Sequence, residues 1–203
     1  LGGSSVSVIG TFKRQTFPAL LAFNARQRCL ATGEKARALE GREPEGVSIF
    51  QPMRGGAVHD PHGAKLLLEQ ALRRGHWGGA PRLLLAIGAH PTALERETWE
   101  ALGRSVGARQ ISLTSELLAS AVGAGLDVLR ARCHLVLHVG SGRCEVGVVA
   151  LGSCLAVRRG EVAGENVDEA IQEYVRRTYH LLIHRQDAER LKVELSQCRS
   201  EEH

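Results

Sequence analysis

The sequence has few aromatic residues and no long apolar run. Aromatic side chains make up only 4% of its 203 residues, and there is a single methionine. No stretch approaches the roughly 18 uninterrupted apolar residues of a membrane span, and no basic, apolar and small-residue succession marks a secretory signal. With 43% hydrophobic and 24% charged residues, the composition predicts a globular cytoplasmic protein and excludes a disordered chain.

A block of positive charge and any regular cysteine spacing are also missing. The net charge is only +4, and the arginines are scattered instead of being clustered with aromatic residues. This pattern favours solvated helix faces over a nucleic-acid surface. The five cysteines include no C-x-x-C pair, which argues against a zinc knuckle or a disulfide framework and indicates reduced thiols.

Two groups of histidines are candidates for a metal site. His180 and His184 are four residues apart and would share a helix face if the helix extends that far, while His59, Asp60 and His62 lie together in HDPH. Neither group has the glutamate partner or the third ligand of a zinc enzyme, and the second contains a proline. We therefore predict no metal at either place.

The first third of the chain predicts short strands and a small insertion. LGGSSVSVI reads as a glycine turn entering a strand, and its start at Leu1, without an initiator methionine or a lead-in, predicts a beginning cut from something longer. The apolar segment 16–23 contains Pro18, which implies a strand edge or a bend. Residues 25–63 are polar and rich in glycine and proline, with one expected helix in GEKARALEG.

The middle of the chain alternates helices and strands. Apolar residues from Ala64 to Leu72 have helical spacing, and RLLLAI (82–87) is expected to be a strand buried on both faces. Thr92 and Glu95 form a capping box that opens the next helix. A strand at QISL (110–113) and a helix from Ser115 follow, so this half predicts an α/β layer structure.

The last third starts again with strands. HLVLHV, CEVGVVAL and CLAVRRGEV are joined by the tight turns GSGR and GS, which predicts antiparallel hairpins. Asn166 is expected to cap a following helix, with Glu169 completing a capping box. Because both ends of the chain open with a glycine turn that leads into strands, two related halves are predicted.

Three long segments resemble the bacterial actin MreB, in the same order and almost without gaps. They are IFQPMRGGAVHD, VGARQISLTSELLASAVGAGLDV and VAGENVDEAIQEYVRRTYHLLI. The similarity runs from Leu1 to about Leu195. The later part of MreB, which holds the rest of its second large domain, has no counterpart in this sequence, so the chain resembles a divergent and truncated member.

The resemblance implies an α/β, actin-like (ribonuclease H-like) ATPase fold, of the superfamily that includes heat-shock ATPases and sugar kinases. Residues 1–132 would form the first large domain, with a small insertion at about 25–63. Residues 133–203 would form the start of the second domain, with a three-stranded meander and a helix. ATP and magnesium are implied in the cleft between the two domains.

The same resemblance implies a set of nucleotide-binding residues. Two glycine turns would face the phosphates with backbone N–H groups, which supply positive dipole without side-chain bulk. Segments near the sugar and the base complete the set. The implied residues are Gly2, Gly3, Ser4 and Ser5 in the first turn, Gly140, Ser141, Gly142, Arg143 and Cys144 in the second, Gly164 and Glu165 near the sugar, and Glu189 and Lys192 on the base and ribose side.

Several positions depart from the family pattern. The aspartate that organises magnesium at the second turn is His138 here, and the aspartate of the first turn falls just before Leu1. Imidazole suits magnesium poorly, so metal-dependent hydrolysis is expected to be weakened or lost. Of two glutamates near the attacking water, only Glu116 remains, either to orient a water or as a first-turn helix acid. Arg143 replaces a small hydroxyl residue and would either neutralise phosphate or fill the cleft with a salt bridge.

The membrane contact of the family is reduced in this sequence. MreB carries a short apolar hairpin that enters the inner leaflet, and the matching GHWGGA segment has Trp77 as its only large apolar residue. Burying one tryptophan contributes about 2 to 3 kcal/mol. Because that is too little for stable anchoring without a second signal, we expect a cytoplasmic protein that at most associates weakly with the inner face of the membrane.

The implied function is that of a degenerate MreB-like actin homologue. It would be a nucleotide-binding or formerly nucleotide-binding scaffold, possessing at most a degraded ATPase, that assembles into a homo-oligomer or filament or with a partner chain completing the second domain. Two alternatives stay open. One is an active ATP-hydrolysing MreB-type filament protein for cell shape, and the other is a small-molecule or sugar kinase of the same superfamily, although no separate sugar-binding motif is present.

Overall fold

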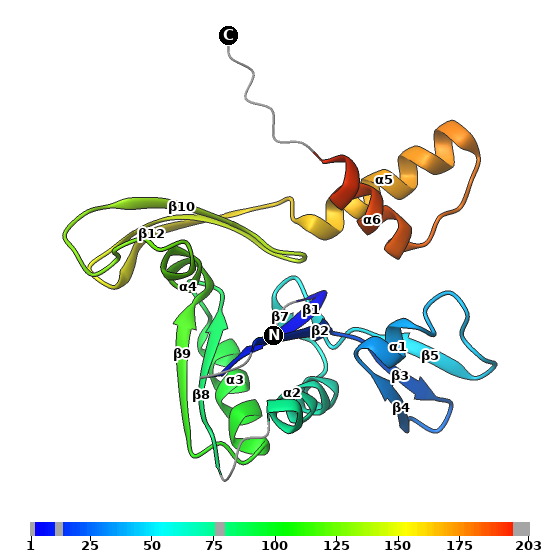
Figure 1. The fold of residues 1–203 in the computed structure, drawn as a ribbon, viewed down its shortest axis with the longest axis horizontal. Coiled ribbons are helices and arrows are strands. Elements are labelled where there is room, and N and C mark those ends of the chain that lie inside the picture. The colour runs from blue at the N-terminus through cyan, green and yellow to red at the C-terminus, as the bar shows by residue number, and fades with distance from the viewer. Residues whose placement is uncertain (1–2, 11–13, 76–79, 197–203) are drawn as a thin grey trace.

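The computed structural model describes residues 3–10, 14–75 and 80–196 of the chain (Figure 1). Its first part begins with β1 (Ser5–Ile9), β2 (Arg14–Pro18), β3 (Leu21–Asn24), β4 (Cys29–Thr32), α1 (Glu34–Arg37), β5 (Val47–Phe50), β6 (Met53–Arg54) and β7 (Ala57–Val58). It continues with α2 (Pro61–Gly75), β8 (Arg82–Ile87), α3 (Ala93–Ser105), β9 (Gln110–Ser115) and α4 (Glu116–Gly123). The second part contains β10 (His134–Val139), β11 (Cys144–Ala150), β12 (Ser153–Gly160), α5 (Gly164–Tyr179) and α6 (Arg185–Leu195).

The β1–β2 hairpin and the β4-β3-β5 sheet share one apolar core. β1 pairs antiparallel with β2, with Val6 opposite Phe17, and β2 ends at Pro18. The chain then bends into β3, the central strand of a separate three-stranded sheet. Phe17 and Leu21 are buried against Leu67 of α2, so this helix joins the hairpin to the second sheet. The bend that Pro18 predicted is confirmed.

A parallel strand pair and two helices form the next layer (Figure 1). β8 pairs parallel with β9, with Leu85 beside Leu113. Trp99 and Leu102 of α3 pack against Leu85 and Ile87 of β8, together with Leu68 of α2. This alternation of strands and helices confirms the α/β prediction for the middle of the chain.

β8 is not buried on both faces, as its continuous apolar sequence predicted. Leu85 and Ile87 are covered, but the side chain of Leu84, on the opposite face, is 68% exposed. A strand is buried on both faces only where a layer covers each of them. Among the described residues α3 covers one face of β8, and no comparable layer covers Leu84.

The second part contains the antiparallel meander that the sequence predicted. β10 pairs with β11 and β11 with β12, with a bulge between Val148 and Val149. α4 packs against one face of this sheet through Ala121, which contacts Val149. Figure 1 shows the sheet lying across the end of the β8–β9 pair, with α4 between them and with α5 and α6 at the far end of the sheet.

Two helix boundaries differ from the sequence predictions. α5 begins at Gly164, with Ala163 as its N-cap, so Asn166 lies in the first turn and its Oδ1 accepts the backbone N–H of Ala163 at 2.9 Å. Asn166 therefore acts from the third helical position and is not the N-cap. At the other end α5 stops at His180, which has a left-handed backbone with φ of 57°. His184 then caps α6, so the two histidines do not share a helix face.

The Thr92 capping box at the start of α3 allows the contribution of one local motif to the free energy of unfolding to be measured. Thr92 Oγ1 accepts the Glu95 N–H at 3.1 Å, and the Glu95 carboxylate accepts the Thr92 N–H at 2.8 Å. We expect Thr92→Ala to lower the free energy of unfolding by about 1 kcal/mol, because the Glu95 N–H loses its side-chain acceptor. Urea denaturation measures this change.

Thr98→Ala is the matched control on the same helix. Thr98 lies in the interior of α3, and its hydroxyl donates to the Leu94 carbonyl. Because alanine has the higher helix propensity, this control is expected to leave stability unchanged or slightly raised. Equal losses in the two variants would contradict the capping interpretation.

Candidate functional site

The two glycine turns that the sequence singled out meet in the structure. The backbone N–H of Ser4 donates to Ser141 Oγ at 3.0 Å, across 137 positions of sequence. A Cβ added to Gly3 would lie 2.6 Å from the same oxygen. Ser5 starts β1, directly after this contact, while Gly2 lies outside the described residues. The first turn therefore contacts the second turn through the Ser141 hydroxyl.

The second turn is also closed against the first part of the chain. Within the turn the Gly140 N–H donates to the Arg143 carbonyl at 2.7 Å, and Cys144 then begins β11. A Cβ added to Gly142 would lie only 2.8 Å from the backbone N of Gly55, in the turn between β6 and β7. Glycine is required here because another backbone occupies the space of a side chain.

The first turn of α5 rests on this second glycine turn. The Gly164 N–H donates to the Gly140 carbonyl at 2.9 Å, and the Glu165 N–H donates to the Ser141 carbonyl at 2.7 Å. Two otherwise unpaired N–H groups of the helix terminus are satisfied in this way. Three of the four implied nucleotide-binding segments thus converge on one place.

The charged residues predicted on the fourth segment already have ionic partners. Lys192 Nζ lies 2.6 Å from Asp168 Oδ1 and donates to the Gly164 carbonyl at 3.1 Å. Glu189 pairs with Arg37 of α1 at 3.1 Å. These contacts join α6 to α5 on one side and to the β3–β5 subdomain on the other.

Sequence reasoning missed Asp168, whose side chain is buried beneath Lys192. Asp168 is only 3% exposed. It lies three residues before Ile171 and seven before Val175, so it shares the inward helix face with those apolar residues. A lone acid within an apolar face predicts a buried charge that needs a partner, and that signal was available in the sequence.

A polar pocket opens between α6 and the first part of the chain. The polar residues that line it include Ser4, Arg37, Glu40, Arg185, Gln186 and Glu189. Arg185 also pairs with Glu165 at 3.0 Å, which connects the pocket to the first turn of α5. The lining is polar, and the enclosed space is close to that of a single water molecule.

His138 stands beside the one remaining carboxylate. Its Nε2 lies 3.7 Å from Glu116 Oε2, and its Nδ1 shares a hydrogen bond of 2.9 Å with Ser120 Oγ. Ser115, which replaces the second glutamate of the family pattern, caps α4 by accepting the Leu118 N–H at 3.3 Å. Within the described residues no group of three or more His, Cys, Asp and Glu side chains could hold a metal ion. The donors at this place do not suit magnesium.

Arg143 points away from the turn and into the contact between the two parts. Its side chain is 5% exposed, with Nη1 3.6 Å from Glu145 and Nη2 3.7 Å from Glu95. The Thr92 N–H and hydroxyl, together with the Arg143 charge, hold the pKa of Glu95 below its usual value. This geometry favours the salt-bridge alternative for Arg143. Glu145 was missed, although it shares the inward-facing side of β11 with Val149.

Two further predictions have different outcomes in the structure. Trp77, on which the membrane prediction depends, lies outside the described residues. Asp60, from the HDPH group, caps α2 by accepting the backbone N–H groups of His62 and Gly63 at 3.1 and 2.9 Å. Across the described part of the chain, no helix has the length and apolar character that crossing a membrane requires.

Comparison with known proteins gives consistent results. A family model described as MreB/Mbl protein matches residues 6–203. Cell shape-determining protein MreB of Escherichia coli (strain K12) is 32% identical over 169 residues, which cover 81% of this chain and 49% of that protein. Cell shape-determining protein Mbl of Bacillus subtilis (strain 168) is 25% identical over 183 residues, 88% of this chain and 55% of Mbl. The chain therefore spans about half the length of these relatives.

Solved structures agree in fold. MreB5 of Spiroplasma citri bound to ADP superimposes with a TM-score of 0.87 at 26% identity, covering 94% of this chain and 59% of that one. The MamK double helical filament superimposes with a TM-score of 0.79 at 17% identity, covering 97% and 63% respectively. At that identity the MamK match concerns the fold alone.

The contact between Gly142 and Gly55 gives a direct test of the closed turns. We expect Gly142→Ala to lower the free energy of unfolding by about 1 to 3 kcal/mol, because the new methyl group must displace a backbone segment. Gly123→Ala in α4 is the control, since a Cβ there meets nothing within 4 Å. Thermal unfolding of both variants measures the difference, and an unaffected Gly142→Ala would show that the turns are farther apart.

Proposed function

Because the chain belongs to the MreB/Mbl family of actin-like cytoskeletal proteins, we propose that it is a scaffold that binds a nucleotide without using magnesium for hydrolysis. Self-assembly of copies of the chain, or assembly with a partner that completes the second domain, is part of this proposal. We place the protein in the cytoplasm, and association with the inner face of the membrane stays a prediction from Trp77.

The observation that carries the proposal is the convergence of the two glycine turns and the first turn of α5. Gly3 and Gly142 have no room for a side chain, and the N–H groups at this place donate to Ser141 Oγ and to carbonyl groups of the second turn, so a phosphate would replace some of these acceptors. Successive backbone N–H groups in such turns attract anions, and the positive end of a helix dipole strengthens the effect. MreB5 of Spiroplasma citri, which has been solved with ADP and with AMPPNP, superimposes over 94% of this chain, and this supports nucleotide binding as part of the proposal.

The residues present fit a nucleotide but not its metal. Gly3 and Ser4 with Gly140 and Ser141 would hold the phosphates, and Glu189 of α6 would lie on the side of the sugar and the base. A bound ATP would supply a phosphoanhydride bond that water can cleave. His138 occupies the position from which the family aspartate would organise magnesium, and Glu116 is its neighbour.

The active-ATPase alternative rests on Glu116 alone. Its carboxylate is the one acid of the family's pair that remains, and in phosphoryl transfer such a group positions the attacking water. In the structure Oε2 of this carboxylate lies 3.7 Å from the His138 imidazole, where the family pattern has an aspartate. The sugar-kinase alternative has no supporting observation among the described residues.

The first experiment measures nucleotide binding with and without metal. We expect a fluorescent ATP analogue to bind the purified protein with dissociation constants that agree within about threefold in magnesium and in EDTA, because the described residues around His138 assemble no set of oxygen ligands for the ion. Binding that is more than tenfold tighter with magnesium would contradict the loss of the metal site. Absence of binding in both buffers would refute the nucleotide part of the proposal.

Two variants of α6 serve as a matched pair for the same titration. Glu189→Gln should weaken nucleotide binding severalfold. The substitution removes a charged group that borders the pocket, and it also removes the ion pair between Glu189 and Arg37. Glu194→Gln changes an exposed glutamate on the same helix, paired only with Arg190 among the described residues, and should have no effect. Equal effects in the two variants would place the nucleotide elsewhere.

The second experiment measures ATP turnover in wild type and in His138→Asp. We expect no magnesium-dependent phosphate release from the wild type and little gain in the variant, because a restored aspartate still lacks the second glutamate, replaced by Ser115. A phosphate-release assay with Glu116→Gln as the reference for background reports both. Clear magnesium-dependent turnover by the wild type would favour the active-ATPase alternative.

A further inference from the structure

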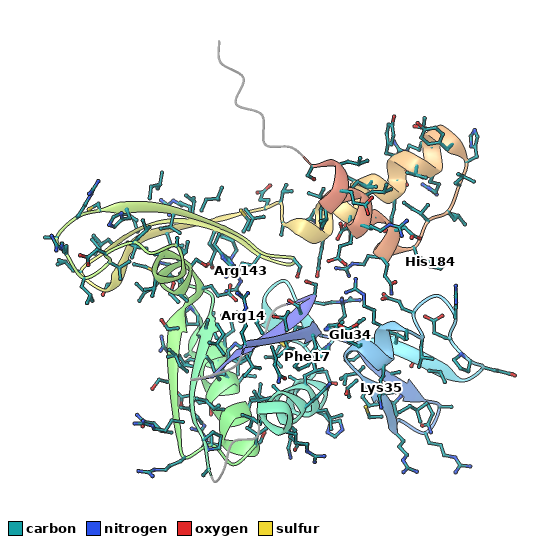
Figure 2. The ribbon with its side chains drawn as sticks, viewed as in Figure 1. Arg14, Phe17, Glu34, Lys35, Arg143 and His184 are labelled. Carbon is teal, nitrogen blue, oxygen red and sulfur yellow. The ribbon has the colours of Figure 1, made fainter. Side chains whose placement is uncertain are left out.

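Arg143 lies between the two parts of the chain and is almost completely buried. Figure 2 shows it beneath the β10–β12 sheet, on the side that faces β1 and the β8–β9 pair. It directly follows Gly142, so the backbone that carries it is the second glycine turn itself. The contacts of the Arg143 side chain therefore help to fix the position of that turn.

The guanidinium has partners on three separate elements. Nη2 donates to the Gly56 carbonyl at 3.0 Å, in the turn between β6 and β7. Nη2 also lies 3.7 Å from Glu95 on α3, and Nη1 lies 3.6 Å from Glu145 on β11. Two of these three elements belong to the first part of the chain, so the side chain crosses from one part to the other.

The first part of the chain is shaped to receive this side chain. A Cβ added to Gly88, at the end of β8, would lie 1.2 Å from Arg143 Nη1, and a Cβ added to Gly56 would lie 2.3 Å from Nε. Both distances are far below a van der Waals contact, so any larger residue at either position would expel the guanidinium. Gly56 and Gly88 thus leave the space that the guanidinium occupies.

Glu145 extends the same contact. Its side chain is 2% exposed, and it accepts the backbone N–H of Ala89 at 3.2 Å. Arg143 comes from the second glycine turn and Glu145 from β11, and both reach residues at the end of β8 or the start of α3. A buried charge without its partner is strongly destabilising, so each of these two side chains requires the other to be in place.

We propose that Arg143 is a clamp that holds the second glycine turn against the first part of the chain. By fixing this turn, the clamp keeps the Ser4 N–H in contact with the Ser141 hydroxyl. This inference does not depend on nucleotide binding, and it can be tested on the protein without ligand.

The test is amide-resolved hydrogen exchange in nucleotide-free and metal-free buffer. The Ser4 and Ala89 amides report on the closed contact because each donates to a side chain of the other part. We expect Arg143→Met to accelerate exchange at these two amides by at least about tenfold, while the amides of β3 (Leu21–Asn24) stay within about twofold of the wild type. Arg143→Lys, which keeps the charge but not the planar fork, should give an intermediate acceleration.

Arg158→Met is the matched control, because Arg158 is an exposed arginine on the neighbouring strand β12. It should leave both reporter amides unchanged. Unchanged exchange in Arg143→Met, or an equal rise at β3, would overturn the proposal, since the first means no clamp and the second means general loss of stability.

Gly88→Ala provides an independent variant if Arg143→Met does not fold. It changes no charged residue, and its added methyl group takes the space of the Arg143 guanidinium. We expect the same acceleration at Ser4 and Ala89, whereas Gly123→Ala should have none. Gly88→Ala with wild-type exchange at both amides would refute the clamp. Failure of the wild type to bind nucleotide, together with the expected acceleration in Arg143→Met and Gly88→Ala, would instead count against the proposed function and leave the clamp in place.

Discussion

The close approach of two backbones is the constraint on which the rest of the structure depends. Ser4 and Ser141 are 137 positions apart, yet they are joined by one hydrogen bond, and Gly142 approaches Gly55 closely enough to exclude a methyl group. The helix α5 then begins on the same turn, so its first N–H groups are satisfied by the turn's carbonyl groups.

Ion pairs surround this contact. Lys192 with Asp168, Glu189 with Arg37, and Arg143 with Glu95 each join different elements of the chain. Asp168 and Arg143 are buried, and buried charges tolerate little displacement because an unpaired ion in the interior is costly. The site is therefore held in one arrangement by its own residues, whereas a metal would need a set of oxygen ligands that is not assembled around His138.

Local patterns predicted much of the fold, and their failures have physical causes. The Thr92 capping box and the turns of the β10–β12 meander depend on neighbouring residues, and the structure confirms them. Leu84 shows what local patterns cannot predict. Its burial depends on whether another layer covers that face of β8, and no local pattern specifies such a layer. The prediction that Asn166 is the N-cap of α5 was wrong for a different reason. An asparagine, which favours the N-cap position, can also accept the backbone N–H of the N-cap residue from the third helical position, as Asn166 does with Ala163.

The sequence by itself determined the alternation of strands and helices, the hairpin turns, the glycine positions and the resemblance to the actin-like family, since each is a matter of short-range pattern or of motif order. Only the tertiary structure decided what the charged residues do. The direction of the Arg143 side chain and the burial of Asp168 and Glu145 depend on partners brought from distant segments. An arginine beside a glycine turn can face solvent, a phosphate or a carboxylate, and the packing of the two parts against each other selects the carboxylates.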